Sequence, residues 1–246
     1  MEVHHHAHIA RKKWTHYLWE FLMLFLAVFC GFLAEYQLEH TIEHTKEKQY
    51  IMSMVEDVNK DMTALDSVIN YHTLISPGLD SLCLQCFRFK KSDSAVKALY
   101  RLHKNYGLKT DVLIEFNDKT LSQLKNAGGM RLIRNLIAAE SITLYDNAIK
   151  KVKSHEGMYG DVIVNSYNLS LKIFNRAYYR QEEEEDPAAN EFGNISLVTD
   201  DMKMLIEYGN TVESLKNVLN DYILLLRQVK EQASGLVQIL KKEYHL

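Results

Sequence analysis

The stretch "HYLWEFLMLFLAVFCGFLAEY", residues 16–36, decides the fold class, because it is typical of a helix that crosses a membrane. No residue from Phe21 to Ala34 is charged, and with its flanks the segment reaches about 20 residues, enough to span a hydrocarbon core. A cleavable signal peptide is the alternative, but no A-x-A-like site follows and Glu35 leads into a highly charged segment. Aromatic residues typical of membrane interfaces flank the span: Trp14, Tyr17, Trp19 and Tyr36. We therefore predict one uncleaved transmembrane helix over residues 14–37.

The charges beside the span predict its orientation. Arg11, Lys12 and Lys13 precede it, whereas Glu35 and Glu39 follow it. Because cytoplasmic flanks carry the excess of Lys and Arg, residues 1–13 are expected in the cytoplasm. Residues 38–246 are then expected outside, in a bacterial periplasm, which makes the bacterial inner membrane the predicted location.

One face of the predicted span carries small and polar residues. On a helical wheel the following fall within about 80° of one another: His16, Glu20, Met23, Ala27, Gly31 and Ala34. Small residues allow close approach of two helices in lipid, so this stripe is a predicted helix–helix interface. For Glu20 three interpretations stay open: a residue at headgroup level bonded to water or to His16, a ring with His16 inside an oligomer that binds or relays a cation or proton, and contact with another membrane protein.

The N-terminus "MEVHHHAHIARKK" carries a histidine cluster: His4, His5, His6 and His8. Neutral imidazoles bind Zn, Cu or Ni, so metal capture is one interpretation. Contact with headgroups or a partner, with charge that changes with pH, is the other. The spacing lacks the i, i+4 geometry of a site preformed on a helix, and no other cofactor is predicted.

The rest of the chain predicts an all-α fold, an elongated bundle on the membrane. The chain has only two prolines and ten glycines, and its apolar residues recur at intervals of three and four. The span is expected to continue as an amphipathic helix until "SPG" at 76–78 ends it. Further helices are expected over about 92–107, 158–180 and 200–244. Between the first two of these, a short helix is expected from an N-cap at Asp118 up to Gly128-Gly129, and a longer one from near Met130. The last helix is long enough to pair antiparallel with the helix that continues the span. The acidic stretch 181–195 is expected to be a loop.

Cys83 and Cys86 form the sequence "CLQC" in the extramembrane part. A local disulfide and free buried thiols are both open, and a metal site or a catalytic dithiol is less favoured. Two cysteines underfill a zinc site, and no βαβ pattern accompanies the motif. Cys30, within the span, is expected to be inert.

No enzyme signature is present. Gly-rich phosphate loops, H-E-x-x-H and G-x-S-x-G are all missing from the sequence. The formal net charge is −3, with no clustered basic excess, which argues against nucleic-acid binding. We therefore expect neither catalysis nor a small-molecule substrate.

Two stretches resemble known sequences. "MEVHHHAHIARKKWTHYLWEFLMLFLAVFCGFLAEYQLEH" resembles the N-terminal module of uncharacterised single-pass membrane proteins of Bacteroidota, which begins Met-Glu-Val-His-His-His and ends its span with Gly-Phe-x-Ala-Glu. "KTLSQLKNAGGMRLIRN" looks more loosely like an L-K-x-x-G-x-x-x-L-I-x-N element of related domains of unknown function, here Leu124, Lys125, Gly128, Leu132, Ile133 and Asn135. The resemblance implies an inner-membrane protein with a helical periplasmic domain, and no activity.

Together these features predict a non-enzymatic, membrane-anchored scaffold or sensor. Its partners would be the lipid bilayer, further copies of the chain and other membrane proteins. The alternative is an oligomeric subunit that conducts or couples ions through Glu20 and His16.

Overall fold

The computed structural model describes residues 14–126, 128–181 and 196–246, and within these ranges it contains helices and no β-strand. The all-α prediction is confirmed. The chain divides into two compact units, Met1–Gln49 and Tyr50–Leu246. The predicted histidine-rich N-terminus and the acidic loop after Gln181 lie outside the described residues.

Helix α1, Trp14–Phe87, is longer than the sequence predicts, because it continues through Pro77 instead of ending at "SPG". Proline removes one helical hydrogen bond, a local cost that buried neighbours on both sides offset: Ile75, Leu79 and Leu82 are at most 6% exposed. Gly78 was expected to help end the helix, but it lies within α1. A Cβ there would lie 2.1 Å from the ring of Tyr106, so glycine permits a close approach rather than a helix end.

Short elements follow α1. Helix α2, Asp93–Leu102, begins after the Ser92 cap and passes into a π-helical turn η1, His103–Gly107, so the predicted end at Gly107 is confirmed. Residues 109–118 have no regular secondary structure, and we call this segment the strap. Helix α3, Lys119–Asn126, then ends before Gly128, which has a φ of 64°, and the 3₁₀ turn η2, Gly129–Leu132, follows.

Helix α4, Leu136–Ile173, joins two helices that the sequence predicts as separate. It begins after the Asn135 cap, later than the expected start near Met130, and it continues through Gly157. A glycine costs a helix only about 1 kcal/mol, and the flanking Val152 and Tyr159 are fully buried. The helix ends at Ile173 rather than near 180, because Phe174 adopts an extended backbone; the short α5, Ala177–Gln181, follows.

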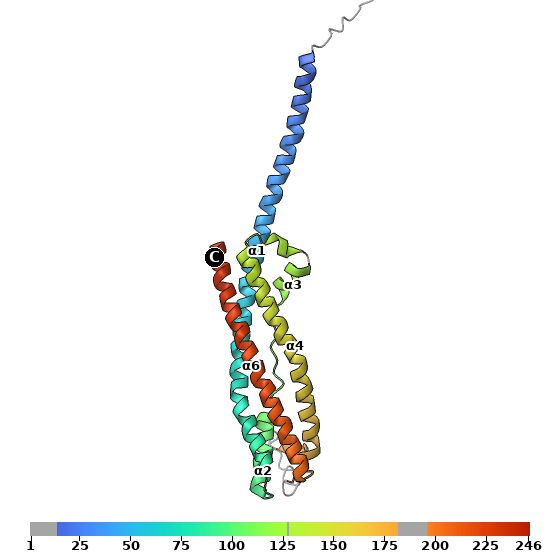
Figure 1. Ribbon diagram of the computed structural model, residues 1–246, viewed down its shortest axis with the longest axis vertical. Helices are drawn as coiled ribbons and strands as arrows, with labels where there is room; N and C mark the ends of the chain where they lie inside the picture. The colour runs from blue at the N-terminus through green and yellow to red at the C-terminus, as the bar shows by residue number, and fades with distance from the viewer. Residues whose placement is uncertain (1–13, 127, 182–195) are drawn as a thin grey trace, which may run out of the picture. The chain divides into compact units, whose positions relative to one another are not determined.

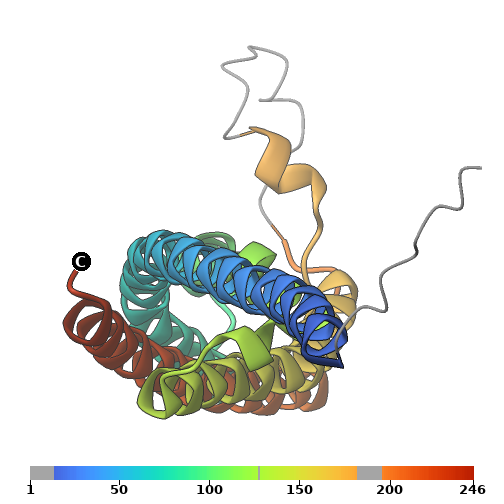
Figure 2. The ribbon, with the colours of Figure 1, turned by 90° about the horizontal axis from the view of Figure 1, so that it is seen from above.

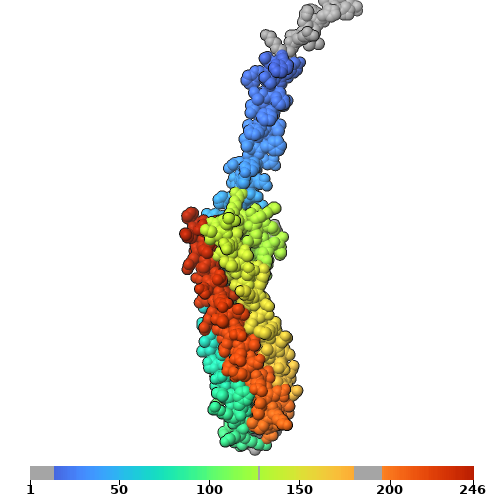
Figure 3. Space-filling model, viewed as in Figure 1, coloured from blue at the N-terminus to red at the C-terminus, as the bar shows by residue number. Residues whose placement is uncertain are grey.

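Helix α6, Met202–Tyr244, confirms the predicted last helix and begins after the Asp201 cap. Its pairing with α1 is antiparallel: Lys230 contacts Asp66, Asn220 contacts Ser76 and Lys216 contacts Asp80. Figure 1 shows the two helices side by side within the second unit, and α6 also packs along α4. The space-filling view shows α6 on the surface of the second unit, with α4 beside it (Figure 3).

The core of the second unit follows one apolar stripe on each long helix. On α6 it recurs at intervals of three and four, as in Leu205, Tyr208, Val212, Leu215, Leu219 and Leu226, all fully buried. The strap lies between the three long helices (Figure 2), where a bundle would normally place a fourth helix. Backbone polar groups at its buried positions, Thr110 and Ile114, therefore need partners from side chains.

Candidate functional site

The polar stripe of the predicted span lies on α1 in the first unit. By length and composition, a segment of α1 is able to cross a membrane, and none of that apolar window is buried. His16 Nε2 lies 3.1 Å from Glu20 Oε1, one turn along the same helix, with both side chains about half exposed. Met23, Ala27, Gly31 and Ala34 are exposed, and a Cβ added at Gly31 would meet nothing.

Cys83 and Cys86 are buried free thiols on α1, one of the two alternatives that the sequence left open. The Cys83 thiol donates to Glu213 Oε2 at 3.2 Å and lies 3.4 Å from the carbonyl of Gly209. Burial raises the pKa of both thiols to about 12, and the hydrogen bond to Glu213 acts in the same direction on Cys83. Thiols this weakly acidic are poor nucleophiles, so the arrangement favours packing over chemistry.

The strap is bound to α1 by a row of buried polar side chains. Asp61, fully buried, accepts from the backbone N–H of Asn117 at 2.7 Å, from its side-chain amide at 3.0 Å and from the Tyr145 hydroxyl at 2.7 Å. His72 Nε2 lies 2.6 Å from the Val112 carbonyl. Since a carbonyl only accepts, Nε2 carries the proton and donates.

On the opposite side, α4 and α6 bind the strap through a closed ring of four residues. The backbone N–H of Ile114 donates to the Tyr222 hydroxyl at 3.0 Å, and that hydroxyl donates to Glu156 Oε1 at 2.9 Å. Glu156 Oε2 pairs with Lys153 Nζ at 3.1 Å, and Nζ donates to the Ile114 carbonyl at 3.2 Å. Both backbone polar groups of Ile114 are thereby satisfied.

Burial fixes the protonation state of several groups in this polar network. Burial raises the pKa of the Tyr145, Tyr159 and Tyr222 hydroxyls, so each keeps its proton as a donor. Burial likewise lowers the pKa of His72, which keeps the imidazole neutral near pH 7.

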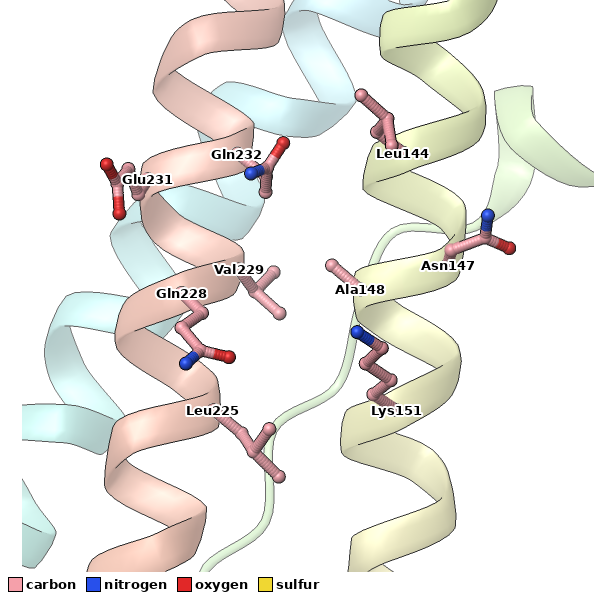
Figure 4. A pocket seen from close by; sticks show the side chains of 9 residues that line it. All are labelled: Leu144, Asn147, Ala148, Lys151, Leu225, Gln228, Val229, Glu231 and Gln232. Carbon is pink, nitrogen blue, oxygen red and sulfur yellow. The ribbon is translucent and has the colours of Figure 1, made fainter.

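A groove lies between α4 and α6. It has a volume of about 570 Å³. Figure 4 shows Ala148 and Val229 approaching across its floor, with Leu144 and Leu225 above and below. Lys151, Gln228 and Gln232 also line it.

The sequence did not single out the residues that hold the strap, although a signal was present. Val58, Asp61, Leu65, Val68 and His72 follow one three-and-four register, and all five are buried. Polar residues at core positions of such a register need partners from elsewhere in the fold. The same reasoning that drew attention to Glu20 in the span would therefore have identified Asp61 and His72.

Among the residues that the structure describes, no group of three or more His, Cys, Asp or Glu side chains is arranged to hold a metal ion. The histidines of the proposed N-terminal metal site, His4, His5, His6 and His8, lie outside the described ranges. Comparisons with protein-family models, with curated proteins and with solved structures find no match to this chain.

Proposed function

We propose that this protein is a single-pass, membrane-anchored interaction protein, a scaffold or sensor whose helical domain presents binding surfaces. The observation that carries the proposal is the uncovered apolar surface of α1. Leu24, Phe21 and Phe32 each expose about two thirds of their side chain or more, and so do several neighbours. Water-soluble proteins rarely expose apolar patches of this extent, whereas a lipid bilayer would cover them.

The proposed location is a bacterial inner membrane, with the N-terminus in the cytoplasm and residues 38–246 in the periplasm. The support is the charge asymmetry across the span, with Arg11, Lys12 and Lys13 on one side. The proposed role of the helical domain rests on its chemistry. Burial keeps His72 neutral and Tyr159 protonated, and two of its concavities, between α4 and α6 and between α1 and α6, are open grooves.

Assembly through the span is proposed to use the stripe of Ala27, Gly31 and Ala34. These positions present little side-chain bulk, so a second helix is able to approach the backbone there. Further copies of the chain and other membrane proteins are the proposed partners.

Two measurements test this proposal. After alkaline carbonate extraction of membranes, the protein should stay in the pellet; recovery in the supernatant would contradict the anchor. Crosslinking in native membranes, followed by mass spectrometry, should then capture oligomers or partners. Gly31→Leu should reduce the crosslinked yield, whereas Phe29→Leu, a change on the opposite face of the helix, should not; equal yields would contradict the stripe.

The alternative function, an ion-coupled subunit, uses the same span. One substitution, Glu20→Gln, distinguishes it from the anchored interaction protein. His16 and Glu20 contact each other along a single helix, which favours the anchored interpretation. In proteoliposomes, Glu20→Gln should leave cation and proton flux at the wild-type level. Flux that depends on Glu20 would replace the anchor proposal with the ion-coupled one.

A further inference from the structure

A second concavity lies between α2 and α5, and its lining combines aromatic rings with cationic side chains. Its volume is about 480 Å³, within the range of small-molecule sites. Ser94 and Ala98 line it with small side chains, while Tyr100, Tyr178 and Tyr179 provide aromatic surface. Two cationic residues of α2, Lys97 and Arg101, complete the lining.

Tyr100, Tyr178 and Tyr179 form the aromatic wall of the pocket, and contacts with the rest of the unit hold it in place. Tyr100 is 6% exposed; its hydroxyl donates to the Ser196 carbonyl at 3.0 Å and accepts from the Asn175 N–H at 2.8 Å. The rings of Tyr178 and Tyr179 each lie 5.5 Å from that of Tyr100, in edge-to-face arrangements. These contacts fix the rings before any ligand arrives, which reduces the entropic cost of binding.

Tyr179 is anchored a second time. Its hydroxyl shares a hydrogen bond with Nδ1 of His103, which is buried and stacks on Phe174 with 4.1 Å between ring centroids. The guanidinium of Arg176 lies 5.7 Å from the centre of the Tyr179 ring. Tyr179 therefore contacts the buried His103 through its hydroxyl and the Arg176 guanidinium through its ring.

Positive charge lies at the rim of the pocket, without a counter-charge paired to it among the described residues. Lys97 and Arg101 are one turn apart on α2 and both are exposed. No ion pair with a described carboxylate involves either of them. Asp93, one turn before Lys97, does not pair with it, and Asp200 pairs with Lys91, its Oδ2 2.5 Å from Nζ. Two cations one turn apart can bind the same carboxylate or phosphate group.

We propose that this pocket binds a small organic anion that carries a carboxylate or phosphate on a flat ring. Lys97 and Arg101 bind the charged group, and the rings of Tyr178 and Tyr179 pack against the flat body of the ligand. The proposal does not depend on the membrane anchor, since all of these residues belong to the second unit.

The test uses the full-length chain in detergent and three probes in isothermal titration: phenyl phosphate, inorganic phosphate and phenol. Phenyl phosphate should bind with 1:1 stoichiometry, and each of the other two should bind at least about tenfold more weakly, because each lacks half of the recognised chemistry. Equal affinity for phenyl phosphate and inorganic phosphate would overturn the role of the aromatic wall. Absence of saturable phenyl phosphate binding would overturn the site.

Paired variants locate the binding. K97Q/R101Q should weaken phenyl phosphate at least about tenfold, because charge-assisted hydrogen bonds are lost. K97R/R101K should retain most of the affinity. K241Q/K242Q removes the same charge from exposed positions at the end of α6 and should bind as the wild type does. Binding by K97Q/R101Q at wild-type strength would overturn the proposal.

A measurement on the wild-type chain removes any dependence on how the variants fold. Phenyl phosphate should protect Lys97 from acetylation by a water-soluble active ester, read by mass spectrometry, and should leave Lys241 fully reactive. Equal acetylation of Lys97 with and without the probe would count against the pocket.

Discussion

The hydroxyl of Tyr222 on α6 accepts a hydrogen bond at 3.0 Å from the backbone N–H of Ile114, in the strap, 108 residues away in the sequence. This contact shows how a segment without secondary structure is held against the long helices. Tyr222 is fully buried, and its hydroxyl also donates to Glu156. One side chain therefore satisfies a strap donor and links it to α4.

Removing that hydroxyl should destabilise the protein. Tyr222→Phe leaves the Ile114 N–H and Glu156 each without one partner, so the free energy of unfolding should fall by about 1–3 kcal/mol. Chemical denaturation followed by circular dichroism measures the change. Tyr167→Phe, on the exposed face of α4, is the matched control and should change stability by less than about 0.5 kcal/mol. Equal effects at the two positions would contradict the structural role of Tyr222.

A buried and an exposed aspartate on α1 should differ in their contribution to stability. Asp61→Ala leaves three donors without their partner, the buried Tyr145 hydroxyl among them, and should cost about 1–3 kcal/mol. Asp66→Ala breaks only the surface pair with Lys230 and should cost about 0–1 kcal/mol. Denaturant midpoints of the two variants provide the comparison, and a cost at Asp66 as large as that at Asp61 would refute it.

Two glycines in helices should respond in opposite directions to alanine. A Cβ at Gly78 would lie 2.1 Å from the Tyr106 ring, so Gly78→Ala should destabilise the protein by about 1–3 kcal/mol. A Cβ at Gly235, on α6, would meet nothing within 4 Å, and Gly235→Ala should stabilise the protein by about 0.4–1 kcal/mol. Thermal melts of both variants test the pair. A stabilising Gly78→Ala would show that Tyr106 does not pack as described.

His103 should make stability depend on pH. Burial, with a smaller effect of the Arg176 charge, lowers its pKa from 6.5 to about 3, so between these values the unfolded chain binds a proton that the folded chain does not. His103 therefore contributes nothing to the pH dependence above about pH 6.5, and it lowers the stability by up to about 1.4 kcal/mol per pH unit as the pH falls toward 3.

Denaturation at pH 7, 6, 5 and 4 isolates this contribution. His103→Gln should be less stable than the wild type at pH 7, because it loses the stacking on Phe174, but its stability should fall less steeply with acid. His245→Gln, at the exposed C-terminus, should keep the wild-type slope. Identical slopes for wild type and His103→Gln would contradict the neutral, buried state of His103.

Cys83 and Cys86 should be inert in the folded protein. Because burial raises the pKa of both to about 12, only about one thiol in ten thousand is ionised at pH 8. In a Cys30→Ser background, a thiol reagent should label neither cysteine until denaturant is added, and then both rapidly. Fast labelling without denaturant, or denatured protein that is labelled only after reduction, would contradict two buried free thiols.

The sequence by itself determined the helical class, the apolar segment of α1 and the bounds of α6. These features depend on neighbours within one or two turns. Apolar residues at intervals of three and four define the buried stripe of α6, and Asp201 caps its start by accepting from the Lys203 N–H. The turn at Gly128 was predictable for the same reason, since its φ of 64° favours glycine.

The tertiary structure alone decided where helices continue and how the strap is held. Pro77 and Gly157 weaken a helix locally, yet both helices continue because their flanking residues are buried against other helices. The partners of the strap come from α1, α4 and α6, tens of residues away in sequence. Local propensities amount to about 1–3 kcal/mol per residue, and burial of several side chains outweighs them. The cationic pocket between α2 and α5 is likewise a product of the fold, since the chain brings Arg101 and Tyr179 to one cavity only when it is packed.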